Sequence, residues 1–159
     1  MKSKSVRCSG ASVKRRPCGS EEQPAAHRAA ATPAVVRRLV AAAAKARRHA
    51  HAPYSKFHVG AALLTVTGKV FTGVNVENAS YGLTMCAERV AVGKAVSEGE
   101  WRFVAIACVA PSADLSPCGA CRQVLAEFGD IAVICADSRR PRQARVERLA
   151  ELLPRAFAL

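Results

Sequence analysis

From residue 84 onward, the sequence alternates between helical patterns and uninterrupted apolar runs that suit buried strands. The expected helices cover Thr84–Glu98, Ser116–Phe128 and Val146–Leu153, and the expected strands cover Phe103–Ala110 and Ile131–Ala136. Strands that alternate with helices form parallel pairs, and a parallel sheet is covered by helices on both faces. The alternation therefore predicts an α/β fold.

One helix and two strands are expected before this region. Thr32-Pro33 suits a helix start, because Thr caps helix N-termini and Pro loses nothing at the first helical position. Val59–Val66 and Val70–Glu77 are predicted strands, and Thr67-Gly68 between them indicates a hairpin turn. Taken together, the elements predict a three-layer α/β/α sandwich around a mixed sheet of four to five strands.

Charge is distributed unevenly along the chain. The formal net charge is +12; residues 1–50 carry twelve Lys or Arg against two acids, whereas residues 51–159 carry twelve against ten. Residues 1–31 also have almost no large apolar side chain, so we expect a basic, disordered arm followed by one domain over residues 32–159. Such a charge block is more often a solvated arm than a nucleic-acid site, so nucleic acid is not an expected partner.

The sequence also bounds the compartment. No apolar run approaches the ~20 residues of a membrane span, and no apolar stretch of a secretory signal follows the basic start. We therefore expect no membrane association and a cytoplasmic location, where the seven cysteines serve metal binding, catalysis or packing. An Arg- and Ser-rich start also fits an organelle transit peptide, which stays open as an alternative.

Two short segments contain the residues best suited to chemistry, Cys86-Ala87-Glu88 and Pro117-Cys118-Gly119-Ala120-Cys121. Both fall at the N-terminal ends of predicted helices. Cys118 and Cys121 are three residues apart, so their sulfurs share one helical face and can bind one ion. With Cys86 as a third thiolate, the fourth tetrahedral position is left for water, as in a catalytic zinc site.

Glu88 is two residues from Cys86 and cannot point in the same direction. It is therefore predicted to be an acid/base beside the metal rather than a fourth ligand. Arg89 is placed to donate a hydrogen bond to a thiolate. A Cys-x-Glu segment combined with a Pro-Cys-x-x-Cys segment is typical of zinc-dependent nucleobase deaminases, in which the Glu is not a ligand.

Each part of this pattern has a simpler interpretation when it is taken alone. A Cys-x-x-Cys pair also occurs as a redox pair or as half of a structural zinc site. Cys86 alone fits a core thiol, and Glu88 alone fits an acid at a helix start. The joint occurrence of both segments at two helix starts, with a strand between them, favours the zinc site.

From about residue 52 to Phe157, the chain resembles the small, tetrameric cytidine deaminases. The matching stretches are Pro53-Tyr54-Ser55-x-Phe57, Val59-Gly60-Ala61-Ala62-Leu63, Gly73-x-Asn75-x-Glu77-Asn78, Cys86-Ala87-Glu88-Arg89, Ser116-Pro117-Cys118-Gly119-Ala120-Cys121-Arg122-Gln123 and Leu152-Leu153-Pro154-x-x-Phe157. The resemblance implies one zinc ion per chain and a homotetramer. Two features depart from the family: the arm before Thr32 is longer than usual, and Asp137–Arg145 is Arg-rich where the family usually has a short edge strand. The formation of a fifth strand near residues 141–145 is therefore left open.

The resemblance implies roles for residues outside the two cysteine segments. Asn75 and Glu77 match the pair that binds the ribose 3′-hydroxyl, and Phe57 matches a residue that packs on the nucleoside. Tyr81 and Phe157 match residues that another subunit contributes, to the 5′-hydroxyl and to the base respectively. Core packing is the alternative for the three aromatic side chains, and a polar strand end is the alternative for the pair.

The implied reaction is hydrolytic deamination of cytidine and 2′-deoxycytidine to the corresponding uridines with release of ammonia. Glu88 would move protons from the attacking water to ring N3 and to the leaving amine, and the carbonyl of Ala87 would accept from the exocyclic amine. A blasticidin-type aminonucleoside deaminase shares the cysteine segments and stays open as an alternative. So does an enzyme that edits polynucleotides by means of the basic arm.

Overall fold

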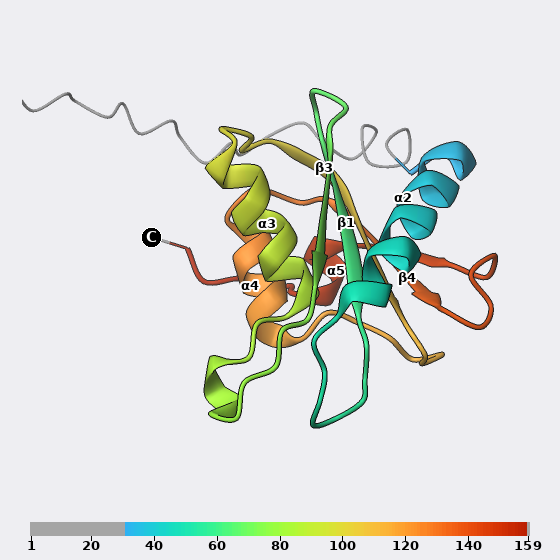
Figure 1. The fold of residues 1–159 in the computed structure, drawn as a ribbon. Coiled ribbons are helices and arrows are strands. Elements are labelled where there is room, and N and C mark those ends of the chain that lie inside the picture. The colour runs from blue at the N-terminus through green and yellow to red at the C-terminus, as the bar shows by residue number, and fades with distance from the viewer. Residues whose placement is uncertain (1–30, 159) are drawn as a thin grey trace, which may run out of the picture.

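The computed structural model describes residues 31–158 of the chain. Within them, a five-stranded sheet runs in the order β2-β1-β3-β4-β5, with one long helix on one face and the remaining helices on the other (Figure 1). The strands are β1 (Gly60–Thr65), β2 (Val70–Val74), β3 (Phe103–Ala110), β4 (Ala132–Asp137) and β5 (Arg145–Arg148). The helices are α2 (Pro33–Ala46), α3 (Ala87–Ser97), α4 (Gly119–Ala126) and α5 (Leu149–Leu152), with short 3-10 turns η1 (Arg47–His49) and η2 (Tyr81–Leu83).

The predicted three-layer sandwich around a mixed sheet is confirmed. β1 pairs antiparallel with β2 and β3, β3 pairs parallel with β4, and β4 pairs antiparallel with β5. One apolar core lies between the sheet and α2, and a second lies between the sheet and α3, α4 and α5. Because β2 and β3 are both antiparallel to β1, they run in the same direction, and the segments that leave them toward α3 and α4 start from the same edge of the sheet.

A glycine allows the first turn of α3 to lie very close to the sheet. A Cβ atom at Gly73 in β2 would be 2.1 Å from the carbonyl oxygen of Ala87 and 3.1 Å from the Cβ of Val90. No side chain fits at that distance, so glycine at this position sets how closely α3 approaches β2. Ala91 and Val92, in the middle of α3, are buried in the chain's own core rather than presented to another molecule.

The predicted starts of two helices lie a few residues before the observed ones. Ser116–Phe128 was expected to be helical, but α4 begins at Gly119, and α3 begins at Ala87 rather than at Thr84. Cys86 and Cys118 have extended backbone angles and stand at the N-cap positions. Both cysteines therefore lie at the exposed positive ends of helices instead of inside the first turns.

The C-terminal region also differs from expectation. The predicted helix over Val146–Leu153 is wrong in its first part, because Arg145–Arg148 forms β5 and only Leu149–Leu152 is helical. The fifth strand does form, with Val146 opposite Ile134 and Glu147 opposite Val133. It pairs with the free edge of β4, whose main-chain N–H and C=O groups would otherwise lack hydrogen-bond partners. A local helical pattern in the sequence does not show that such an edge needs a partner strand.

None of the helices in residues 31–158 has the length and apolar content that a membrane crossing requires. The basic arm of the prediction lies, apart from Ala31, outside the described residues.

Candidate active site

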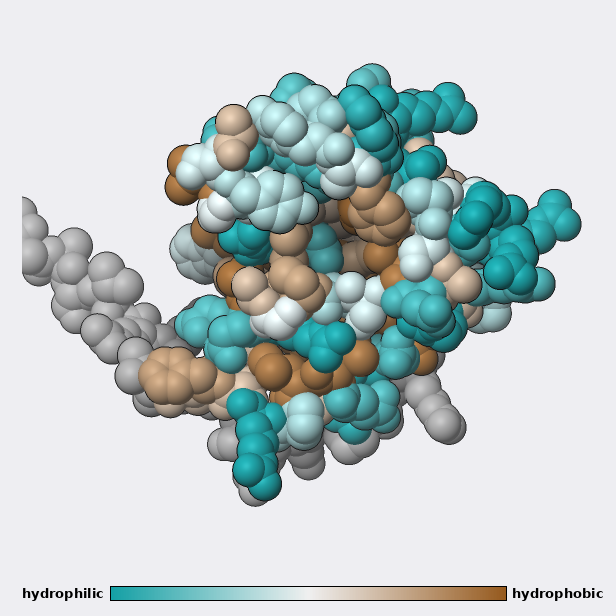
Figure 2. Space-filling view, turned by 90° about the horizontal axis from the view of Figure 1, so that it is seen from below, coloured by the Kyte–Doolittle hydropathy of each residue, from teal (hydrophilic) through white to brown (hydrophobic). Residues whose placement is uncertain are grey.

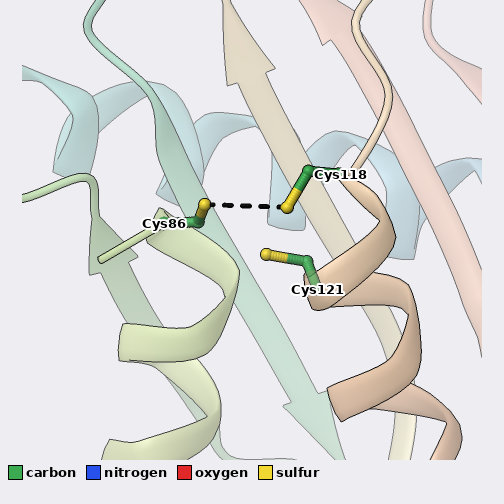
Figure 3. A group of neighbouring side chains, drawn as sticks. All are labelled: Cys86, Cys118 and Cys121. Carbon is green, nitrogen blue, oxygen red and sulfur yellow. Dashed lines mark hydrogen bonds between the residues drawn. The ribbon is translucent and has the colours of Figure 1, made fainter. Parts of the chain in front are cut away.

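Three cysteines converge where the first turns of α3 and α4 face each other (Figure 3). Cys86 caps α3, Cys118 caps α4, and Cys121 lies in the first turn of α4. Their Sγ atoms all lie within 4.8 Å of one another, and the Sγ atoms of Cys86 and Cys118 are 3.8 Å apart. In the figure, all three side chains point into the space between the two helices.

The donor set fits a zinc ion. Zinc–sulfur bonds of about 2.3 Å in a tetrahedron place the sulfurs about 3.8 Å from one another, close to the spacing of Cys86 and Cys118. Disulfide sulfurs would be about 2.05 Å apart, and these cysteines are free thiols. Three soft sulfur donors select zinc or another thiophilic metal over magnesium or calcium.

Arg89 and the neighbouring thiols favour a thiolate at Cys86. The pKa of Cys86 is lowered to about 5, mainly by a hydrogen bond with Cys121 and then by Arg89, although burial opposes the shift. Arg89 Nη2 donates to the carbonyl oxygen of Thr84 at 3.0 Å and to the Sγ of Cys86 at 3.7 Å. The pKa of Cys121 is raised because its thiol hydrogen-bonds to Cys86. The side chain of Arg89 thus lies where the sequence placed it, beside a ligand candidate.

Glu88 lies in the first turn of α3, next to the three cysteines. Its side chain is only 6% exposed, and it contributes to the lining of a pocket. Burial, as the main cause, raises the pKa of the Glu88 carboxyl above its ordinary value. A buried carboxyl of this kind holds a proton more readily than an exposed one, which suits a group that takes up and returns protons.

The pocket has a volume of about 410 Å³, enough for a small organic molecule. Figure 2 views the molecule from the end where the segments around Phe57 and Tyr81 emerge, and the surface is hollowed near the middle of this face. The lining residues are Ser55, Phe57, Val59, Asn75, Glu77, Tyr81, Thr84, Cys86, Ala87, Glu88, Leu115, Ser116 and Cys118. One cavity therefore joins Cys86, Cys118 and Glu88 to a set of polar and aromatic side chains.

Asn75 and Glu77 lie in this pocket, and both also hold the segment before β1. Asn75 Nδ2 donates to the carbonyl oxygen of Phe57 at 2.8 Å, and its Oδ1 accepts from the main-chain N–H of Val59 at 2.8 Å. Glu77 accepts from the N–H of Tyr54 at 2.9 Å and from the N–H and hydroxyl of Ser55. The hydroxyl of Ser55 is the main cause of the lowered pKa of Glu77, so this carboxylate is ionised and acts only as an acceptor.

A scan against family models matches residues 34–137 to the cytidine and deoxycytidylate deaminase zinc-binding region. The chain belongs to this family. A cytidine deaminase of Sporosarcina psychrophila is 48% identical over 126 residues, which cover 77% of this chain and 91% of the relative.

A solved structure of cytidine deaminase from Burkholderia pseudomallei superposes on the deaminase fold described above with a TM-score of 0.69. It shares 48% sequence identity and covers 76% of this chain and 97% of its own. A blasticidin-S deaminase of Bacillus cereus is less similar, at 39% identity over 83 residues, or 46% of this chain and 59% of the relative. The zinc-binding region is thus a family feature of this chain, and the three cysteines are a group of described residues that could hold the metal.

Of the three aromatic residues that were predicted to contact the substrate, two line the pocket and one does not. Phe57 and Tyr81 line the pocket, Tyr81 with 67% of its side chain exposed. Phe157 is 71% exposed and is not among the described residues that line this deaminase pocket. Its main chain is nevertheless fixed, because Gln123 Nε2 donates to the Phe157 carbonyl at 2.9 Å and Gln123 Oε1 accepts from the Phe157 N–H at 3.0 Å.

Sequence reasoning assigned no role to several residues around the deaminase pocket. Ser55, Thr84 and Ser116 line it, and each lies within or beside a motif that the sequence had singled out. That adjacency was the available signal. Leu115 directly precedes Ser116, but its apolar side chain gave no chemical signal, because an isolated Leu in a loop is ordinary in any sequence.

Proposed function

We propose that this chain catalyses zinc-dependent hydrolytic deamination of cytidine and 2′-deoxycytidine to uridine and 2′-deoxyuridine, with release of ammonia. The proposal rests on one observation above all, the buried carboxyl of Glu88 beside three converging cysteine sulfurs in a pocket of nucleoside size. Family membership and two relatives named cytidine deaminase at 48% identity support the same reaction.

Cys86, Cys118 and Cys121 are the proposed ligands of one zinc ion per chain. When bound, zinc lowers the pKa of a coordinated water toward neutrality and so supplies a nucleophile. The chain's own contribution is to favour a thiolate at Cys86, by means of the hydrogen bond from Arg89 and the positive N-terminal end of α3.

Glu88 is the proposed carrier of protons. Deamination adds water across the C4–N3 bond and then expels the amino group, so one proton must reach N3 and another must reach the amine before ammonia leaves. A single carboxyl beside C4 can take the proton of the attacking water, give it to N3, and then move a proton to the leaving amine. The burial that raises the pKa of Glu88 supports this role, since it favours the protonated form that the second half of the reaction needs.

The remaining pocket residues are proposed to orient the nucleoside. The carbonyl of Ala87 would accept a hydrogen bond from the exocyclic amine, and Asn75 with Glu77 would bind the ribose 3′-hydroxyl. Phe57 would pack against the nucleoside. All four residues line the same cavity as Glu88, which supports their joint action on one substrate.

We further propose that the active form is a homotetramer whose sites are shared between subunits. Tyr81, Leu83 and Phe157 are 67%, 68% and 71% exposed, a large apolar exposure for side chains of a single chain. The two hydrogen bonds from Gln123 fix the main chain of Phe157 while its ring faces outward. A ring held in this way is suited to enter the pocket of a neighbouring copy.

Two further proposals concern the whole chain. The catalytic unit would consist of residues 32–159, with the basic arm outside it. The location would be cytoplasmic; the described cysteines, all free thiols, support a reducing compartment.

The test is a direct assay of the purified, zinc-loaded protein, with loss of cytidine absorbance as the readout. We expect activity on cytidine and 2′-deoxycytidine, about one zinc per chain, and similar kinetics after removal of residues 1–31. Blasticidin S and single-stranded DNA serve as alternative substrates in parallel. Turnover of either one without turnover of cytidine would contradict the proposed function.

A further inference from the structure

The loop from Pro111 to Pro117 joins β3 to α4 and forms one wall of the pocket. Leu115 and Ser116 line the cavity directly, and the loop ends at Cys118. Within the described part of the chain, no main-chain hydrogen bond ties residues 112–117 to backbone groups outside the loop. Some other interaction must therefore fix the shape of this wall.

Arginine side chains take the place of those missing main-chain bonds. Every second carbonyl oxygen of the loop accepts from a guanidinium. Pro111 accepts from Arg139 Nη2 at 3.1 Å, Ala113 and Leu115 accept from Arg145 Nη1 and Nη2 at 3.0 and 2.8 Å, and Pro117 accepts from Arg122 Nε at 2.8 Å. Arg122 also donates to the hydroxyl of Ser116 at 3.0 Å.

Arg145 makes the central contact of this series. It is the first residue of β5 and lies opposite Cys135 in the register with β4, so its main chain belongs to the sheet. Its two terminal nitrogens reach carbonyls two residues apart, a span that suits the fixed fork of a guanidinium and that one ammonium nitrogen does not reproduce. Arg139 is itself held in place, because its main-chain N–H and its Nε both donate to Asp137 Oδ1.

We propose that Arg145, assisted by Arg139, is a positioning residue that fixes the pocket wall formed by Leu115 and Ser116 and thereby sets the affinity for the nucleoside. The proposal rests on the function proposed above. It gives a role to the Arg-rich segment 137–145, which the catalytic residues do not explain.

Arg122 and Arg145 contact different parts of the loop, and this difference determines the kinetics that we expect. Arg122 holds Pro117, the residue next to Cys118, so the metal ligands keep their support when Arg145 is removed. Arg145 holds the part of the wall that faces the substrate without touching the reacting atoms. Its loss should therefore weaken ground-state and transition-state binding equally, which raises KM and leaves kcat nearly unchanged.

The experiment compares three variants of the full-length, zinc-loaded protein. Arg145→Ala should raise KM for cytidine about tenfold, which corresponds to roughly 1.4 kcal/mol, with kcat and zinc content within about twofold of the parent protein. Arg145→Lys keeps the charge but reaches one carbonyl, so its KM should fall between the two. Arg142→Ala is the matched control, because Arg142 lies in the same segment and its side chain makes none of the loop contacts; its KM should not change.

Limited proteolysis within residues 112–117 gives a second readout that does not depend on activity. Cleavage in this loop should be faster in Arg145→Ala and at the parent rate in Arg142→Ala, because loss of the two carbonyl contacts lets the loop open locally. An unchanged KM in Arg145→Ala, or a fall in kcat together with zinc loss, would overturn the positioning role. If Arg145→Ala does not fold, a parent-like KM in Arg145→Lys would overturn it. A parent protein that fails to deaminate cytidine refutes the proposed function instead, whatever the cleavage rates show.

Discussion

At the scale of single residues, chemically identical side chains perform different tasks according to their position. Cys86, Cys118 and Cys121 lie at helix starts and face one another, whereas Cys108 and Cys135 are neighbours within the sheet. Burial raises the pKa of Cys108 well above its ordinary value and that of Cys135 to about 12, so both remain neutral thiols. Position, not residue type, separates candidate ligands from core residues.

This contrast supplies a first prediction with its own control. Cys118→Ala should lose both zinc and deaminase activity, since two thiolates rarely hold zinc in an open catalytic site. Cys135→Ala removes a thiol of the same size from the core and should retain full zinc content at a stability cost of about 1 kcal/mol. Metal analysis of both purified variants decides the matter. Full zinc occupancy in Cys118→Ala would show that the ion binds elsewhere.

Glu88 allows a prediction that separates proton transfer from metal binding. Glu88→Gln preserves the shape of the side chain but cannot carry a proton, so activity should fall by at least about a thousandfold while zinc content and melting temperature stay close to the parent values. The measurements are steady-state kinetics, metal analysis and thermal unfolding. Zinc that decreased in step with activity would mean that Glu88 is a ligand.

At the scale of elements, the site depends on how closely α3 approaches the sheet. Gly73→Ala introduces a Cβ atom 2.1 Å from the carbonyl oxygen of Ala87, so the first turn of α3 must shift and carry Cys86 with it. We expect a loss of about 2 kcal/mol in the free energy of unfolding and weaker zinc binding. Gly93→Ala, also in α3 but with open space around the added atom, should instead stabilise the protein by about 0.5–1 kcal/mol. Equal zinc affinity in the two variants would contradict the dependence on this close approach.

Most of the elements could be predicted from the sequence, because apolar runs such as Phe103–Ala110 report burial directly. The structure has that strand with the same bounds. The helix starts at Ala87 and Gly119 were missed because Thr84 and Ser116 fit helix-start statistics locally, while the extended caps at Cys86 and Cys118 are set by packing between helices. The fifth strand was left open near residues 141–145, and it forms at Arg145–Arg148. The sequence did not decide between strand and helix there, because Val146–Leu153 also fits a helical pattern.

For the site, too, only the features that depend on local sequence patterns could be predicted. Its two cysteine segments are short and local, so their residue types and spacing could be recognised directly. The hydrogen bonds from Arg145 to the loop 111–117 join residues about 30 positions apart. No local pattern in the sequence indicates which carbonyl oxygen an arginine will contact. Long-range polar contacts of this kind depend on the assembled sheet, which places Arg145 beside Leu115.

At the scale of the whole molecule, the pocket of one chain contains the proposed catalytic groups but lacks the ring of Phe157. Glu88 lines the cavity, whereas Phe157 is exposed elsewhere and fixed by Gln123. A closed, symmetric assembly would bring each exposed ring to the pocket of a neighbour. The active site would then be a property of the oligomer and not of the chain.

Mixing two defective proteins tests this arrangement. Glu88→Gln lacks the proton carrier but has Phe157, and Phe157→Ala has the reverse defect. If Phe157 acts in a neighbouring subunit, co-assembled tetramers contain some pockets with both groups intact, about a quarter of them for random 1:1 mixing. Co-expression with two affinity tags isolates the mixed assemblies, whose activity should clearly exceed the mean of the two parent variants.

A second mixture serves as the control for the first. Glu88→Gln and Cys118→Ala both damage groups that lie in the same chain's pocket, so no mixed tetramer of these two variants regains a complete site, and its activity should stay at the level of the inactive parents. Recovery in the first mixture and not in the second identifies sharing through Phe157. If neither mixture gains activity, or if the protein is a fully active monomer at nanomolar concentration, Phe157 serves no neighbouring pocket, and each chain carries a complete site alone.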